Sequence, residues 1–164
     1  MSLLKSRRPT AIYCSPLPHA VSTIAPLFND DEVTARICYC SWLREVDTGD
    51  WEGKTYNQVA DDYPELLEAY LRDPTQHQFP RGERLMAAYE RASAAFRELV
   101  CQDNDEPTRI VLVGHPWINR LILTDYCGAD IQDHRHIDQF PGRFTVIRYA
   151  FGEPELQSIG AAVV

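Results

Sequence analysis

The stretch at residues 109–114, Arg-Ile-Val-Leu-Val-Gly, constrains the fold of this chain most strongly. Its continuous apolar character is typical of a strand in a parallel sheet that is covered on both faces. His115 and Pro116 follow directly, and residues 116–126 fit a helix with proline in its first turn. A buried strand that leads through a polar residue into a helix predicts an α/β fold with a ligand site at the end of the strand.

The rest of the chain alternates between the patterns of strands and helices. The helical pattern is clearest at residues 83–100, where apolar side chains recur at three- and four-residue spacing. Strands are expected at residues 10–14, 36–42, 143–150 and 155–159, and helices at residues 18–28, 55–62, 64–72 and 83–100. This order predicts a three-layer α/β sandwich with a mostly parallel sheet and a C-terminal antiparallel hairpin. Since no repeat or Gly/Ser linker interrupts it, residues 1–164 are interpreted as a single domain.

The charge balance disfavours two classes of partner. The chain has 16 basic and 24 acidic residues, a formal net charge of −8, and no basic run longer than Arg7-Arg8. We therefore expect no nucleic-acid partner and no attraction to an anionic membrane. No apolar stretch reaches the ~18 residues of a membrane span. The first residues lack the apolar core of a secretion signal, and the 5 cysteines are scattered, so a cytoplasmic protein is expected.

His115 is the strongest candidate for a functional residue. A side chain at the carboxyl end of a parallel strand faces the crevice in which α/β folds bind ligands. The helix that follows turns its amide donors and positive dipole end toward an anion. The alternative is a capping or core histidine, and position alone does not decide between the two.

Two further residues lie at junctions between predicted elements. Glu45 lies where a strand gives way to the glycine-bearing loop at 47–53, so it could reach the crevice as a proton donor. Its acidic neighbours in the loop are equally compatible with solvated charges. His19 starts the helix after Ser15-Pro16-Leu17-Pro18, where the partial positive charge favours a phosphate.

His134 and His136 are separated by one residue. This spacing places two rings on one face only in an extended segment, so a polar loop is the preferred interpretation and no metal site is expected. A small metal-dependent hydrolase that uses these histidines stays open as a third functional hypothesis.

Five ordered motifs carry a family resemblance. They lie at residues 12–23 (Ile-Tyr-Cys-Ser-Pro-Leu-Pro-His-Ala-Val-Ser-Thr), 43–53 with 62–65, 82–83, 113–115 with 118–120, and 137–139 with 145–147. In this order they resemble the histidine phosphatase superfamily of phosphoglycerate mutase-like proteins, and most of all its alpha-ribazole phosphatase-like branch. The resemblance covers the chain from about Leu4 to its end.

The resemblance implies a phosphomonoesterase of a small phosphorylated metabolite, without a metal or other cofactor. In the family, a histidine of an N-terminal Arg-His-Gly motif takes the phosphoryl group, and a second histidine and two arginines hold its oxygens. By resemblance His115 is the second histidine and Glu45 protonates the leaving oxygen. His19, Ser15 and Asn119, which belong to the matched motifs, are then substrate-binding residues.

The sequence departs from the family pattern in its catalytic residues. It contains no Arg-His-Gly, and His19 replaces a pocket arginine, so a mostly neutral group stands for a permanent cation. Deleting a catalytic nucleophile costs on the order of a million-fold in turnover. We therefore expect the chain as it stands to be nearly inert. The alternative function is a catalytically inactive relative that binds a ligand or a protein.

The family places the strand of the absent motif between the strand that ends at Gly114 and the one that begins near Arg143. Buried backbone groups left unpaired cost about 1 to 3 kcal/mol each. We therefore expect either that these two strands close up or that a second copy of the chain covers the gap as a homodimer. The sequence is also compatible with an N-terminally truncated piece of a longer, active protein.

Overall fold

The computed structural model describes residues 9–28, 34–101, 109–140, 142–150 and 153–162. Within these ranges, no helix combines the length and apolar character that crossing a membrane requires.

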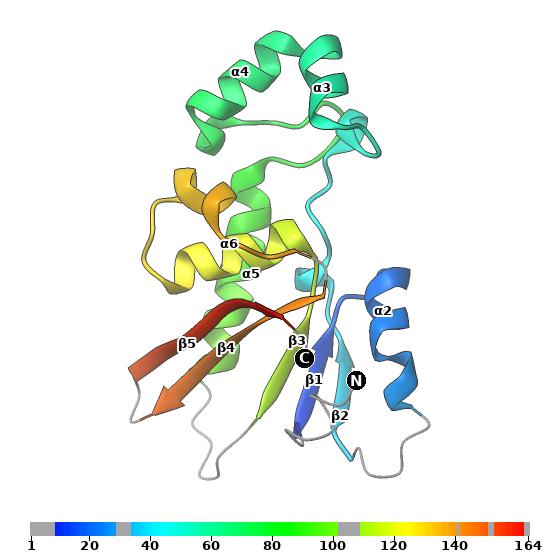
Figure 1. Ribbon diagram of the computed structural model, residues 1–164, viewed down its shortest axis with the longest axis vertical. Coiled ribbons are helices and arrows are strands. Elements are labelled where there is room, and N and C mark those ends of the chain that lie inside the picture. Colours follow the sequence, from blue (N-terminus) through cyan, green and yellow to red (C-terminus); the bar gives the residue numbers. More distant parts are fainter. Residues whose placement is uncertain (1–8, 29–33, 102–108, 141, 151–152, 163–164) are drawn as a thin grey trace.

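A three-stranded parallel sheet occupies the lower half of the view in Figure 1. Its middle strand is β1 (Ala11–Cys14), and β2 (Arg36–Tyr39) and β3 (Ile110–Val113) flank it. Both ladders are parallel, and Ala11 lies opposite Arg36 on one side and Ile110 on the other. The carboxyl ends of all three strands therefore reach the same edge of the sheet.

Helices cover both faces of this sheet. On one face α2 (Pro18–Ile24) buries its apolar residues against β1 in a cluster of Ile12, Cys14, Ala20, Ile24 and Leu27. On the other face lie the long α5 (Leu85–Val100) and α6 (Pro116–Tyr126), which form the larger core. This arrangement confirms the three-layer α/β sandwich.

Two short helices form a cap beyond the carboxyl ends of the strands (Figure 1). They are α3 (Tyr56–Asp62) and α4 (Pro64–Arg72). α3 begins at a capping box, in which Thr55 and Gln58 satisfy each other's backbone N–H groups. Pro64 opens α4 because its missing N–H costs nothing in a first turn. The cap lies above the sheet edge where a ligand site is expected.

Several elements differ from their predicted bounds. α2 ends at Ile24, and a 3-10 turn at Ala25–Leu27 follows because Pro26 cannot continue an α-helix. The second strand stops at Tyr39 rather than at residue 42, and Ser41–Leu43 form another 3-10 turn.

The C-terminal strands β4 (Arg143–Ala150) and β5 (Glu153–Ala162) form the predicted antiparallel pair. The expectation that β3 and β4 close up is wrong. β4 makes its ladder with β5, β3 makes its ladder with β1, and no ladder in the described ranges joins the two sheets. One edge of β3 and one edge of β4 therefore remain without a strand partner in this part of the chain.

Candidate functional site

Three predicted residues meet at the carboxyl ends of β1 and β3. Ser15 directly follows β1, and His115 follows β3 after Gly114, so the parallel pairing of these strands brings them together. The Nε2 atom of His115 and Oγ of Ser15 lie 2.8 Å apart. His19, on α2, packs edge-on against the His115 ring with 5.3 Å between the ring centroids.

The His115 ring is buried, with 5% of its surface exposed, whereas His19 is exposed. Burial, and to a smaller degree the neighbouring His19, lower the pKa of His115 below its usual value. Because the usual histidine pKa is about 6.5, a ring whose pKa is lowered is mostly neutral at pH 7, and a bound anion would favour its protonated form. His19 provides the exposed side of this histidine pair.

Asn119 is one turn further along α6. Its backbone N–H donates to the carbonyl oxygen of His115 at 2.9 Å. Its side-chain oxygen would lie only 2.5 Å from a Cβ placed on Gly114. Glycine at position 114 therefore lets the Asn119 amide reach the end of β3, beside His115.

The Glu45 carboxylate lies at the start of α6. It accepts hydrogen bonds from the backbone N–H groups of Trp117 at 3.3 Å and Ile118 at 3.1 Å, and from Val46 at 3.0 Å. Burial raises the pKa of Glu45, although these three donors and Arg120 favour its charged form. The amides that were predicted to face an external anion thus bind a carboxylate of the chain itself.

A hydrogen-bonded clamp holds the Glu45 segment, and sequence reasoning missed it. Arg91 of α5 donates to the carbonyl oxygens of Trp42 at 3.0 Å and Arg44 at 3.1 Å, and to Glu83 Oε1 at 2.9 Å. The same Glu83 oxygen accepts from the backbone N–H of Asp47 at 3.0 Å. In the sequence, Arg91 shows only the charge pattern of an exposed helix face, and Glu83 enters only as part of the motif at 82–83.

His134 is a buried structural residue, so the prediction of a polar loop is wrong for it. Its Nδ1 lies 2.6 Å from the carbonyl oxygen of Ile131 and must donate there. Its Nε2 therefore accepts from the Tyr70 hydroxyl at 3.0 Å. His136 is exposed. Since both ring nitrogens of His134 are occupied, a metal could bind only by breaking this network, and the described residues offer no cluster of three candidate ligands.

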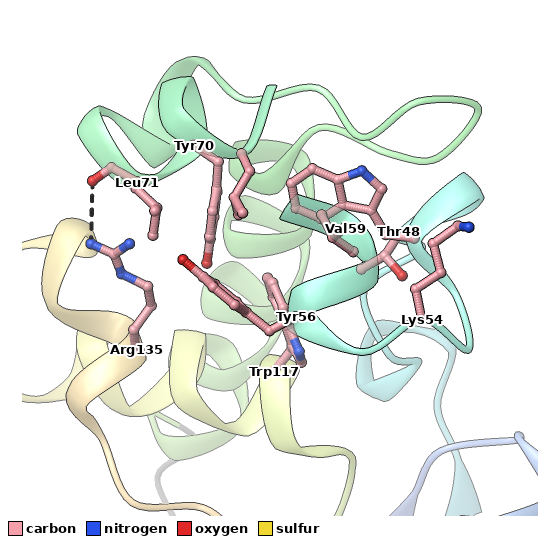
Figure 2. A pocket seen from close by; sticks show the side chains of 10 residues that line it. Thr48, Lys54, Tyr56, Val59, Tyr70, Leu71, Trp117 and Arg135 are labelled. Carbon is pink, nitrogen blue, oxygen red and sulfur yellow. Dashed lines mark hydrogen bonds between the residues drawn. The ribbon is translucent and has the colours of Figure 1, made fainter. Parts of the chain in front are cut away.

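A cavity of about 340 Å³ opens beneath the cap (Figure 2). We call it the cap cavity, and it is lined by Thr48, Trp51, Lys54, Tyr56, Val59, Leu67, Tyr70, Leu71, Trp117 and Arg135. Among these residues Trp117 belongs to α6, and residues 73–81 contribute none. The aromatic residues in 51–70 were the signal that sequence reasoning left unused.

Comparison with known proteins gives one family and several relatives. The family model of the histidine phosphatase superfamily (branch 1) matches residues 1–162. The chain is 24% identical over 135 residues to the 6-phosphofructo-2-kinase/fructose-2,6-bisphosphatase of Arabidopsis thaliana, which covers 82% of this chain and 17% of that protein. It is 30% identical over 87 residues to phosphoserine phosphatase 1 of Hydrogenobacter thermophilus, which covers 53% of this chain and 40% of that protein. The chain thus spans less than half the length of these curated relatives.

Solved structures share the fold at low sequence identity. Mycobacterial hydrolase 1 superposes with a TM-score of 0.81 at 24% identity, over 99% of this chain and 80% of that chain. A mycobacterial glucosyl-3-phosphoglycerate phosphatase in complex with inorganic phosphate gives 0.80 at 23%, over 98% and 81%. The alpha-ribazole phosphatase from Shigella flexneri gives 0.73 at 21%, over 94% and 75%.

Proposed function

Because the chain belongs to the histidine phosphatase superfamily, we propose that it is a phosphomonoesterase by descent, of the alpha-ribazole phosphatase-like kind, that binds a small phosphorylated metabolite of the cytoplasm. The phosphate would lie at the carboxyl ends of β1 and β3. The supporting observation is the hydrogen bond between the side chains of His115 and Ser15, which lies beside the exposed His19. These side chains, with Asn119, would hold the phosphate oxygens.

In this proposal His115 and Glu45 have different roles. A bound phosphate would favour the imidazolium form of His115, which then stabilises the negative charge of the phosphoryl oxygens. The raised pKa of Glu45 suits a carboxyl group that protonates the leaving oxygen as the P–O bond breaks and the phosphoryl group passes to a nucleophile, which in the family is the histidine of the Arg-His-Gly motif. Glu45 would have to exchange its bonds to the start of α6 for one to the leaving oxygen.

The second candidate function is binding without turnover. The printed sequence contains no Arg-His-Gly, so the phosphohistidine route lacks its nucleophile in these 164 residues. The neutral His115 and the commitment of Glu45 to three backbone donors also favour a site that binds more readily than it reacts.

Hydrolysis of 4-nitrophenyl phosphate and calorimetric titration with vanadate separate the two candidates. Turnover that is lost in His115→Gln supports an enzyme. Vanadate binding without turnover, weakened by His115→Gln, supports the binding module. His136→Gln is the matched control, because that exposed histidine takes no part in the proposed site. If vanadate binds neither to the unaltered chain nor to the control, the phosphate site is wrong.

We also propose that a second copy of the chain covers the unpaired edges of β3 and β4. Open edges of apolar strands are templates for pairing with another chain. Light scattering after size-exclusion chromatography should give twice the monomer mass. A monomer mass at every concentration would contradict the homodimer.

A further inference from the structure

We propose that the cap cavity binds a planar aromatic group that carries an anionic substituent. Together with the phosphate site, this makes the metabolite a phosphate monoester of an aromatic compound. This inference rests on the proposed function for its phosphate half. The aromatic half rests on the cavity alone.

Four aromatic side chains form the walls of the cap cavity: Trp51, Tyr56, Tyr70 and Trp117. The rings of Tyr70 and Trp117 lie 6.0 Å apart and are inclined by 31°, and Trp51 meets Tyr70 edge-on. Flat walls of this kind favour a flat ring, because offset stacking and edge-to-face contacts add to the affinity that comes from burying apolar area. The volume of about 340 Å³ lies at the lower end of the range for small-molecule sites.

Tyr56 is unusually exposed for a large ring that lines a cavity. Its exposed fraction is 62%, and Figure 2 shows the side chain reaching across the opening toward Tyr70 and Trp117. Among the described residues it has neither a hydrogen bond nor a ring contact. A ligand in the cavity would bury the exposed apolar surface of this ring. Tyr56 should therefore contribute more to the binding free energy than the three rings that are already packed.

Arg135 supplies the positive charge. Its guanidinium lies 5.5 Å from the centre of the Tyr70 ring and makes one long hydrogen bond, 3.4 Å, to the carbonyl oxygen of Leu71. Its Nε is buried without a partner. Within the described ranges no carboxylate pairs with Arg135, whereas Lys54, the other cation of the cavity, is paired with Asp62 at 2.7 Å. A guanidinium that has no carboxylate partner among these residues and a buried Nε–H without an acceptor fits a ligand whose carboxylate or other anionic group lies next to Arg135.

Trp117 connects the cap cavity to the proposed phosphate site. Its ring lines the cavity, its backbone N–H donates to Glu45, and it is two residues from His115. An aromatic group stacked on Trp117 would therefore place its phosphoester oxygen close to the carboxyl group proposed to protonate it.

Isothermal titration with three phosphate-free probes tests the cavity by itself. 2-Naphthoate has both the ring and the charge, 2-naphthol has only the ring, and cyclohexanecarboxylate has only the charge. We expect 2-naphthoate to bind at least about fivefold tighter than either of the others, since one stacking or charge-assisted contact is worth about 1 kcal/mol. Equal affinities, or no binding of 2-naphthoate, would overturn the inference.

Two variants locate the binding. Tyr56→Ala and Arg135→Gln should each weaken 2-naphthoate binding by about five- to tenfold. Tyr39→Ala is the control for the first, because Tyr39 is 54% exposed and lies on β2, and Arg72→Gln is the control for the second. Binding that survives both cavity variants, or that falls equally in the controls, would show that the probe lies elsewhere.

2-Naphthyl phosphate then tests the phosphate half. It should bind tighter than 2-naphthol, and His115→Gln should reduce that difference. If 2-naphthoate behaves as expected but His115→Gln has no effect on 2-naphthyl phosphate, the aromatic site stands and the proposed function fails. If His115→Gln has its effect but the two cavity variants do not, the proposed function stands and the present inference fails.

Discussion

Trp117 belongs both to the start of α6 and to the lining of the cap cavity, and the two regions differ in how their charged side chains are partnered. At the start of α6 the Glu45 carboxylate accepts three backbone hydrogen bonds, and the Arg91 guanidinium is engaged by carbonyl oxygens and Glu83. In the cap cavity Arg135 has no ion partner among the described residues, and Tyr56 is exposed. In the first region the charged side chains are partnered within the chain. In the second, a cation and an aromatic ring are available to the ligand proposed above.

The largest expected effect is a loss of stability when the Arg91 clamp at the start of α6 is removed. Arg91→Ala removes the donors to three carbonyl oxygens and the partner of Glu83 at once, and should lower the free energy of unfolding by about 3 kcal/mol. Urea denaturation measures the change. Arg72→Ala, which breaks only the exposed pair with Glu68, should cost less than about 0.5 kcal/mol. Similar losses in both variants would mean that the Arg91 clamp contributes no more than a surface pair.

Gly82→Ala should affect ligand binding at the start of α6 but not in the cap cavity. A Cβ at this position would overlap the carbonyl oxygen of Asp47, two residues beyond Glu45, so the loop must move and about 2 kcal/mol of stability should be lost. Gly53→Ala meets no neighbouring atom and carries only the cost of its positive φ, about 1 kcal/mol. Vanadate binding should weaken in Gly82→Ala while 2-naphthoate binding persists. Equal loss of both would show that the regions are not independent.

Glu45→Gln should change the affinity for anions at the start of α6. Removing the carboxylate charge should strengthen the binding of inorganic phosphate by on the order of fivefold at pH 8, equivalent to about 1 kcal/mol. Calorimetry measures this, with 2-naphthoate as the comparison ligand whose affinity should change less. An unchanged phosphate affinity would place the bound phosphate away from Glu45, and turnover unchanged by this variant would exclude Glu45 as the proton donor.

The smallest expected effect is a gradual dependence of stability on pH. Burial lowers the pKa of His77, His115 and His134, so the unfolded chain binds more protons than the folded one as the pH falls through the usual histidine range. Stability is then present above a pH of about 6.5 and is lost on acidification. The raised pKa of Glu45 works in the opposite direction, since the folded state favours its protonated form.

Urea midpoints between pH 7.5 and pH 5.5 measure this slope. His134→Gln should reduce it, whatever its effect on stability at pH 7.5, because one buried imidazole no longer titrates. The exposed His136 provides the control variant His136→Gln. A slope that is the same in all three proteins would show that the buried rings are not its source.

The layers of the fold and the place of His115 followed from local sequence patterns. The apolar run of β3 and the helical spacing of α5 identify the type of each element from its own residues, although the four residues of β3 are half-buried rather than buried. His115 could be located because the end of a parallel strand is a defined place in an α/β fold. The structure confirms this fold class.

What the sequence did not reveal depends on contacts between distant segments. Glu45 caps a helix 72 residues further along the chain, and Tyr70 binds His134 across 64 residues. The cap cavity is assembled from α3, α4, α6 and the turn that holds Arg135. No local pattern distinguishes a glutamate that caps a remote helix from one in a solvated loop, and only the fold decides between them.

From the pairing of the strands we also expect a particular order of folding. β4 and β5 are neighbours in sequence, with Ala150 opposite Glu153, and hairpins of this kind form within about 1 to 10 μs. By contrast, Thr10 and Arg109 are 99 residues apart. They are joined by a hydrogen bond next to Ala11 and Ile110, the first residue pair of the β1–β3 ladder. The entropy of closing that loop must be overcome before the parallel ladder yields any stabilisation. We therefore expect Ser15 and His115 to meet only in the last, slowest phase of folding, after the hairpin has formed.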